Sequence, residues 1–189
     1  MTTRGPELKG RLVAGRYEIL EWIGEGGFAS VWRARQLNPE GEVAVKILHP
    51  EHSRDPKIVA SFLREAKLYV PFRDEPNIAT VLECGHDEEN DVHFLVMTLL
   101  GRTVGAEIEA AGPLPLERVL QIAEDVGRAL ETVHGAGLVH RDVKCSNIMT
   151  TRSAGAGRER FVLTDFGIGL LQEVADKTIT TRELDRVGS

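Results

Sequence analysis

The chain has 189 residues, of which 42% are hydrophobic and 28% charged, and its formal net charge is −6 at pH 7. This length and hydrophobic content allow a buried core, and the negative charge argues against nucleic acid or an anionic membrane as the main partner. No apolar run approaches the roughly 20 residues needed to span a bilayer. The two cysteines, Cys84 and Cys145, are far apart and show no metal-ligand pattern, so we expect free thiols and a cytoplasmic location.

The polar residues 1–10 are expected to form a loose tail, and the first recognisable motif is a glycine-rich segment. This segment lies between two β-prone runs, 17–23 and 31–34, and reads Gly24-Glu25-Gly26-Gly27-Phe28-Ala29-Ser30-Val31. Glycines at a hairpin tip let backbone N–H groups approach phosphate oxygens without an intervening Cβ. The glycines lead into a strand pattern, which excludes a dinucleotide-binding βαβ unit, and the absence of G-x-x-x-x-G-K-[ST] excludes a P-loop NTPase. A glycine-rich hairpin on its own is more often only a turn.

The next strand pattern carries a lysine. In the run Val43-Ala44-Val45-Lys46-Ile47, the valines and the isoleucine alternate with Ala44 and Lys46. Alternation places Ala44 and Lys46 on one face of the strand. The small Ala44 leaves room for a flat base while Lys46 reaches phosphates from the same face. The alternative is a lysine on the solvent side of a half-buried strand.

Residues 55–70 are predicted to form a helix that provides a partner for this lysine. The apolar positions that recur at helical spacing are Ile58, Phe62, Leu63, Ala66 and Tyr69. Glu65 lies within this helix, whereas Glu51, Glu75 and Glu83 lie outside it. Glu65, in the run Arg64-Glu65-Ala66, is thus a candidate partner for Lys46. A charged residue on such a helix is otherwise part of a solvated face.

Two further strands are predicted at 78–85 and 92–99, joined by a charged turn over 86–91. A hinge is expected at Leu99-Leu100-Gly101. The clearest helical pattern of the chain runs from Leu116 to His134, with Pro115 in its first turn, and is predicted to be a core helix. Its apolar stripe consists of Leu116, Val119, Leu120, Ala123, Val126, Leu130 and Val133. A polar hairpin loop over 150–160 and a short strand over 161–164 then precede Asp165.

The most informative motifs come next: His140-Arg141-Asp142-Val143-Lys144-Cys145-Ser146-Asn147, followed by Asp165-Phe166-Gly167. Asp142 and Asn147 are spaced as in the H-R-D-x-x-x-x-N catalytic loop, and Asp165 opens a D-F-G. Together with the glycine-rich segment and V-A-V-K, in this order, they make the chain resemble a eukaryotic-type (Hanks-type) serine/threonine protein kinase of bacterial kind. Two departures from the family pattern are Ala29 in place of the third glycine and Cys145 in place of a common proline.

The resemblance implies an α+β, protein-kinase-like bilobal fold. Residues 11–98 would form a small β-rich lobe with one helix, and residues 99–189 a hinge and an incomplete, mainly helical large lobe ending in the activation segment. Gly188-Ser189 resembles the start of the segment that leads to A-P-E, so the sequence is expected to cover about the first two-thirds of a kinase domain. A patch of the 116–134 helix would then be left exposed.

The resemblance also implies roles for individual residues. Lys46, paired with Glu65, would contact ATP phosphates; Asp142 would accept the proton of a substrate Ser/Thr hydroxyl; and Lys144 would stabilise the transferring phosphoryl group. Asn147 and Asp165 would hold Mg²⁺. His140 is expected to pack beneath the loop. The nucleotide-contacting set would be Gly24, Glu25, Gly26, Gly27, Phe28, Ala29, Val31, Ala44, Lys46, Met97 (the gatekeeper position) and Leu99.

Regulation and partners follow from the same resemblance. A buried Arg141 guanidinium would need an anion, which phosphorylated Thr178, Thr180 or Thr181 would supply. Expected partners are ATP, a protein substrate and a second kinase molecule in a dimer, with no nucleic acid and no membrane segment. The alternative from another class is a catalytically silent module that binds nucleotide or a protein. Retention of all four residues, Lys46, Asp142, Asn147 and Asp165, favours the kinase for the parent protein. The incomplete large lobe favours the silent module for the chain as it stands.

Overall fold

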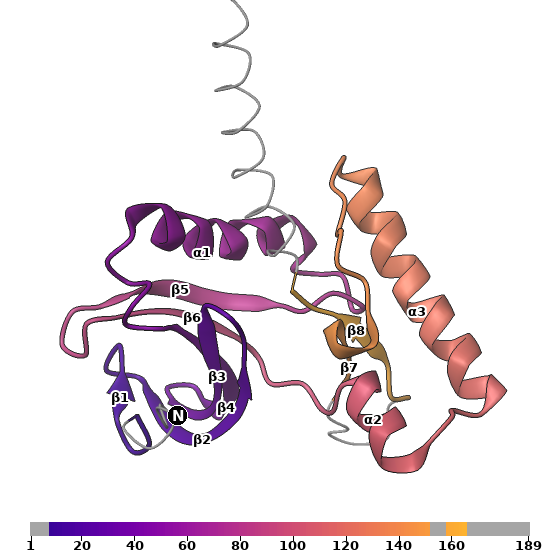
Figure 1. The fold of residues 1–189 in the computed structure, drawn as a ribbon, viewed down its shortest axis with the longest axis horizontal. Helices are drawn as coiled ribbons and strands as arrows, with labels where there is room; N and C mark the ends of the chain where they lie inside the picture. The colour runs from indigo at the N-terminus through magenta and orange to yellow at the C-terminus, as the bar shows by residue number, and fades with distance from the viewer. Residues whose placement is uncertain (1–7, 152–157, 166–189) are drawn as a thin grey trace, which may run out of the picture.

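In the computed structural model, which describes residues 8–151 and 158–165, the first half of the chain forms a curled antiparallel sheet (Figure 1). Its six strands follow the order β1-β2-β3-β4-β6-β5. The strands are β1 (Leu12–Val13), β2 (Tyr17–Glu25), β3 (Ala29–Leu37), β4 (Glu40–Leu48), β5 (Val81–Asp87) and β6 (Val92–Thr98). The alternating pattern of β4 is realised as expected, because Val43, Val45 and Ile47 all enter one core cluster with Trp32 and Phe94.

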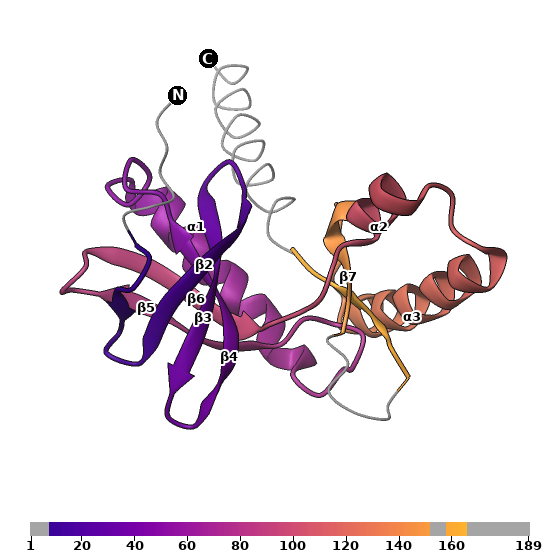
Figure 2. The same cartoon turned by 90° about the horizontal axis from the view of Figure 1, so that it is seen from below.

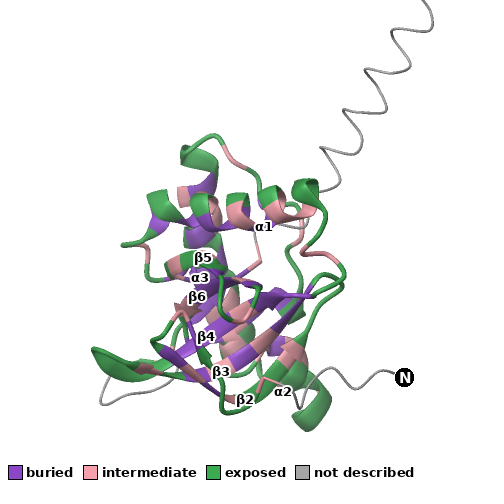
Figure 3. Ribbon diagram, turned by 90° about the vertical axis from the view of Figure 1, so that its left-hand side faces the viewer, coloured by how far each residue is buried: buried purple, intermediate pink, exposed green. Residues whose placement is uncertain are grey.

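Helix α1 (Pro56–Tyr69) packs across this sheet (Figures 1 and 2). Asp55 caps its N-terminus, because its side chain accepts a 2.8 Å hydrogen bond from the Lys57 N–H group. Phe62 and Ala66 bury themselves against Leu95 and neighbouring sheet residues. Buried residues concentrate in the sheet strands, and the outer side of α1 is exposed (Figure 3). The helix predicted for 55–70 is confirmed.

The second lobe contains α2 (Val104–Ala111), α3 (Leu116–Gly135) and a small antiparallel pair, β7 (Ile148–Thr150) with β8 (Phe161–Leu163). Two single turns of 3-10 helix, η1 (Val70–Phe72) and η2 (Cys145–Asn147), complete the elements. β7 and β8 lie between the sheet and α3 in both views (Figures 1 and 2). This arrangement agrees with the expected small β-rich lobe and a mainly helical second lobe.

Two segments join the lobes. The first is the stretch between η1 and β5, where Asn77 donates a 2.8 Å hydrogen bond to the Phe161 carbonyl and accepts one from the Leu163 N–H group. The second is the stretch after β6, where Gly101 donates to the Thr150 carbonyl at 2.7 Å. A Cβ on Gly101 would lie 2.3 Å from Thr150 Oγ1, so only glycine allows this approach. Gly101 therefore fixes the connection that the sequence suggested as a hinge.

Several predicted boundaries are wrong by a few residues. β5 begins at Val81 instead of residue 78, because Ile78 forms only an isolated bridge with Leu163. β5 also continues through Asp87, which shortens the predicted 86–91 turn. Pro115 is the N-cap residue of α3, with ψ of 148°, and does not lie in the first helical turn. Helix α2 and strands β1 and β7 were not predicted, because each is too short to show a period in the sequence.

The apolar stripe of α3 is buried over only part of its length. Val126 and Val133 are buried in the second-lobe core, whereas Leu116 is 72% exposed and Leu120 60% exposed. The buried face instead includes Asp125, whose carboxylate accepts a hydrogen bond from the Phe161 N–H group at 2.9 Å. The exposed patch predicted for this helix is therefore present on its N-terminal half.

No helix within residues 8–151 and 158–165 has the length and apolar character required to cross a bilayer.

Candidate active site

Lys46 lies at the centre of a charged cluster drawn from three parts of the fold. Its Nζ donates to Glu65 Oε1 at 2.7 Å and to Asp165 Oδ1 at 3.3 Å. Lys46 comes from β4, Glu65 from α1, and Asp165 follows β8, so the contact joins the two lobes. The contact with Glu65 was expected from the family resemblance, while the contact with Asp165 was not anticipated.

The two carboxylates keep Lys46 in its charged form. Burial disfavours the ammonium, but the nearby charges of Glu65 and Asp165 outweigh this effect and raise the pKa of Lys46. Glu65 is itself buried, at 8% exposure, which is rare for a glutamate without a cationic partner. The two carboxylates therefore hold the Lys46 ammonium in a fixed position, where it can meet an anionic group of a ligand.

The loop before β7 gathers the residues of the second motif. Asp142 Oδ2 accepts hydrogen bonds from Lys144 Nζ at 2.8 Å and from Asn147 Nδ2 at 2.9 Å. The hydrogen bond from Lys144 lowers the pKa of Asp142. Burial acts in the opposite direction, and the hydrogen bond from Asn147 lowers the pKa further. Asp142 is thus an oriented, ionised carboxylate at neutral pH.

The Asn147 side chain fits a cation-binding role. Its amide nitrogen is directed at Asp142, where it also donates to the main-chain carbonyl at 2.9 Å, so the amide oxygen is the atom that could bind a cation. The Asn147 carbonyl accepts a 2.9 Å hydrogen bond from the Thr164 N–H group, which places the loop beside Asp165. An amide oxygen and a carboxylate are the hard oxygen donors that Mg²⁺ prefers. The residues present therefore fit this metal.

His140 packs beneath the loop, as expected, and is 1% exposed. Its Nε2 lies 2.9 Å from the Thr164 carbonyl oxygen, and the Asp142 N–H group donates to its Nδ1 at 3.2 Å. A backbone N–H can only donate and a carbonyl can only accept, so these partners select a neutral ring with its proton on Nε2. Burial lowers the pKa of His140, and the hydrogen bond to Thr164 and the carboxylates of Asp142 and Asp165 oppose this only in part.

This lowered pKa predicts an acid-sensitive fold. Below about pH 6.5, the ordinary histidine pKa, the unfolded chain takes up a proton on His140 while the folded chain does not, so the free energy of unfolding falls with decreasing pH until the lower folded pKa is reached. The slope from one site is at most about 1.4 kcal/mol per pH unit. Urea unfolding between about pH 7.5 and about pH 5.5 measures it.

A variant comparison isolates the contribution of this histidine. His140→Gln should show a shallower pH dependence than the parent chain. Part of the dependence should remain, because burial also lowers the pKa of His93. Identical slopes in the parent and His140→Gln would show that His140 does not titrate differently in the two states.

The glycine-rich segment forms the β2–β3 hairpin, closed by a 2.8 Å hydrogen bond from the Gly26 N–H group to the Ala29 carbonyl. A Cβ at Gly26 would lie 3.4 Å from the Ala29 oxygen, and one at Gly27 would meet nothing within 4 Å. The packing of this hairpin thus does not require glycine at these two positions. Ala29, which replaces the third glycine of the motif, is 3% exposed and belongs to the core cluster under α1.

The residues expected around a base lie on adjacent strands. Ala44 on β4 is the direct cross-strand partner of Met97 on β6, and Val31 on β3 pairs with Lys46. Leu99 follows β6 and is 9% exposed. Met97 also packs against the cluster that contains Phe62, so its side chain belongs to the core as well. Register alone thus brings the small Ala44 and Met97 together.

One expectation for the regulatory residues is wrong, and others fall outside the structure described. Arg141 is exposed, not buried, and adopts a φ of 66°. Asp165 has a similar φ of 60°. Thr178, Thr180 and Thr181, as well as Phe166 and Gly167, lie outside the described residues.

Sequence reasoning also missed residues that hold the site in place. Asn77 and Asp125 are buried, and both bind main-chain groups of Phe161 at the start of β8, the strand that delivers Asp165. Neither forms part of a motif, and a single polar residue in a sequence does not show that it is buried.

Comparisons with known proteins agree with this geometry. The chain matches the protein kinase domain family over residues 17–184. It is 36% identical over 175 residues to the serine/threonine-protein kinase PknA of Mycobacterium tuberculosis, covering 90% of this chain and 39% of PknA. It is also 36% identical over 162 residues to the serine/threonine-protein kinase PrkC of Bacillus subtilis, covering 85% of this chain and 24% of PrkC.

The fold comparison gives the same result. The crystal structure of the Mycobacterium tuberculosis PknI kinase domain matches with a TM-score of 0.66 and 28% identity, covering 85% of this chain and 62% of the PknI chain. The chain therefore spans less than two-fifths of these curated relatives and about three-fifths of the solved kinase domain. The match covers most of the chain and includes the lysine, the catalytic loop and Asp165. The chain belongs to the protein kinase domain family.

Proposed function

We propose that this chain is the ATP- and Mg²⁺-binding part of a serine/threonine protein kinase, which transfers the γ-phosphoryl group of ATP to a protein hydroxyl. The observation that carries the proposal is the contact of Lys46 with both Glu65 and Asp165. It joins a phosphate-binding cation to a metal-binding carboxylate across the two lobes. The relatives named above are serine/threonine kinases, which supports the same substrate class.

In the proposed binding mode, the β2–β3 hairpin covers the phosphates and Ala44, Met97 and Leu99 border the base. Lys46 contacts the phosphates, and its ionic partners prevent it from swinging away. Asn147 and Asp165 would hold Mg²⁺, which supplies charge neutralisation on the phosphate oxygens when bound. The free thiols of Cys84 and Cys145 and the need for ATP suit a cytoplasmic location.

Lys144 and Asp142 have complementary tasks in this proposal. Asp142 receives the substrate hydroxyl proton, and Lys144 stabilises charge on the transferring group. The hydrogen bond from Lys144 is the main cause of the lowered pKa of Asp142. When Lys144 turns to the phosphoryl group, this contact weakens and the carboxylate becomes more basic at the moment it is needed.

The proposal is tested by binding and transfer measurements together. Mg·ATP binding is followed by titration calorimetry, and transfer by radiolabel incorporation into serine-, threonine- and tyrosine-containing peptides. The proposal expects binding that requires Mg²⁺, and label on serine or threonine. Binding without transfer would favour a silent nucleotide-binding module, and absence of binding would contradict both.

A substitution in the hairpin separates ligand binding from folding. Gly26→Ala should leave the stability within about 0.5 kcal/mol of the parent, because the added Cβ makes only an ordinary contact. It should weaken Mg·ATP binding about fivefold, the equivalent of one perturbed hydrogen bond of about 1 kcal/mol, because the methyl group obstructs the approach of phosphate.

Gly41→Ala is the matched control for this substitution, because Gly41 is exposed and a Cβ there meets nothing within 4 Å. The control should bind Mg·ATP normally. Unchanged binding in Gly26→Ala would place the phosphates away from this hairpin.

A further inference from the structure

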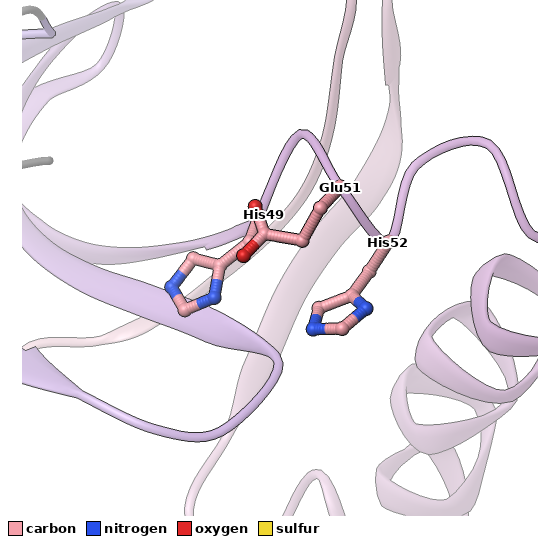
Figure 4. Close-up of side chains that lie close together, drawn as sticks. All are labelled: His49, Glu51 and His52. Atoms are coloured by element: carbon pink, nitrogen blue, oxygen red, sulfur yellow. The ribbon is translucent and has the colours of Figure 1, made fainter. Parts of the chain in front are cut away.

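A second cluster of chemically active side chains lies just after β4, apart from the residues discussed above. His49, Glu51 and His52 each offer a ligand atom, and these atoms lie within 4.8 Å of one another (Figure 4). A tight turn produces the cluster, because the N–H groups of His52 and Ser53 donate to the His49 carbonyl at 2.9 and 3.1 Å. The turn brings the two imidazoles to the same side of the chain.

His49 is the anchor of this cluster. It is 6% exposed, and one nitrogen of its ring is turned toward Glu51 and His52 (Figure 4). Its Nε2 lies 3.0 Å from Glu25 Oε1, but the two groups are not aligned as a hydrogen bond, and this buried nitrogen has no hydrogen-bond partner among the described residues. A buried polar atom left in this state is uncommon and costs stability.

The donor set indicates the kind of ligand. Two imidazoles and one carboxylate form a mixed nitrogen and oxygen set, which suits Zn²⁺, whereas Mg²⁺ and Ca²⁺ prefer oxygen ligands alone. We propose that His49, Glu51 and His52 bind one Zn²⁺ ion through three side chains, with a fourth position open.

Binding of Zn²⁺ would also give the buried Nε2 of His49 a hydrogen-bond partner. An ion held by the ring nitrogen that faces the cluster places the proton on Nε2, next to the Glu25 carboxylate. A metal-bound histidine commonly donates its other N–H to a carboxylate in this way. A small rotation of the Glu25 side chain, which is 44% exposed, completes that hydrogen bond.

The proposed zinc site lies against the tip of the β2–β3 hairpin. His52 Nε2 lies 3.3 Å from the Gly27 carbonyl oxygen, and its ring centroid lies 5.0 Å from that of Phe28. The His49 N–H group donates to the Phe28 carbonyl at 2.9 Å. An ion that fixes both imidazoles therefore ties the turn over residues 49–52 to the tip of the β2–β3 hairpin. The binding itself does not depend on the proposed kinase function.

The first experiment measures Zn²⁺ binding to the 189-residue chain by titration calorimetry, with excess Mg²⁺ present to occupy sites made only of oxygen donors. One ion per chain is expected. Glu51→Gln and His52→Gln should each weaken binding about tenfold or more, because loss of an outer partner alone often costs that much. Both residues lie outside the core, so the variants are expected to fold.

Two other histidines serve as controls. His134→Gln, at an exposed position of α3, and His86→Gln, in the β5–β6 hairpin, should bind Zn²⁺ like the parent chain. No stoichiometric binding, or equal affinity in His52→Gln and the parent, would overturn the proposal. A loss of affinity in His86→Gln but not in His52→Gln would place the ion elsewhere and would also overturn it.

The second experiment examines the ligand type and the hairpin. The Co²⁺-substituted chain should show absorption typical of low coordination number without a thiolate charge-transfer band; such a band would place the ion on Cys84 or Cys145 and contradict the site. Hydrogen exchange of residues 26–28 should slow on addition of Zn²⁺ in the parent chain and not in His52→Gln. Equal exchange with and without Zn²⁺ would show that the ion does not reach the hairpin.

Discussion

Lys46→Met is expected to lower phosphoryl transfer about 100-fold or more, comparable to removal of one preorganised electrostatic donor from an active site. Methionine keeps the apolar stem of the side chain and removes the ammonium that bridges Glu65 and Asp165. Radiolabel transfer to a serine- or threonine-containing peptide measures the effect. Lys57→Met, at an exposed position in the first turn of α1, is the control and should retain full transfer.

The same substitution should also destabilise the fold, by about 3 kcal/mol, because it leaves the buried Glu65 without its cation. The double variant Lys46→Met/Glu65→Gln removes the stranded charge and should recover most of this stability. It should not recover transfer, because the phosphate contact is still missing. Transfer that returned with stability would show that Lys46 acts only through folding.

Asp142→Asn is expected to lower transfer by about 100-fold to 10,000-fold, the usual contribution of a positioned general base. The amide keeps an oxygen to accept the hydrogen bond from Asn147 Nδ2, so the loop should hold its geometry. Mg·ATP affinity should therefore stay close to that of the parent. Calorimetry for binding and radiolabel incorporation for transfer test the two statements separately.

A charge-matched control accompanies this variant. Asp91→Asn removes one exposed carboxylate in the β5–β6 turn and should change neither quantity. If Asp142→Asn lost nucleotide affinity as strongly as transfer, Asp142 would be a metal-binding or structural residue instead of the base.

Local patterns in the sequence were sufficient for the five longer strands of the sheet, β2 to β6, and for the two long helices. Alternation of side chains in β4 and helical spacing in α1 both reflect backbone geometry that repeats over a few residues. The contact between Lys46 and Glu65 was accessible for a different reason, since the family resemblance pairs these two motif residues. Short elements such as α2 and β7 were missed because they are too brief to display a period.

The exposed half of α3 shows where this reasoning reaches its limit. A stripe of apolar residues indicates which face of a helix packs against the protein, but it does not indicate which part of the helix length is covered. Val126 and Val133 meet the β7–β8 pair and the segment before β5, while Leu116 and Leu120 meet solvent. Burial of each position depends on neighbours that are distant in the sequence.

The sequence by itself determined the family and the order of the motifs, because glycine, lysine and carboxylate spacings are properties of the chain alone. Only the tertiary structure decided that Lys46 reaches Asp165, 119 positions away, and that the Ala29 methyl group belongs to the core. It also decided that His49 is buried beside Glu25. These contacts are set by how strands, helix and turn pack in three dimensions, since the direction of a side chain and its burial depend on the assembled neighbours and not on the residues next to it in sequence.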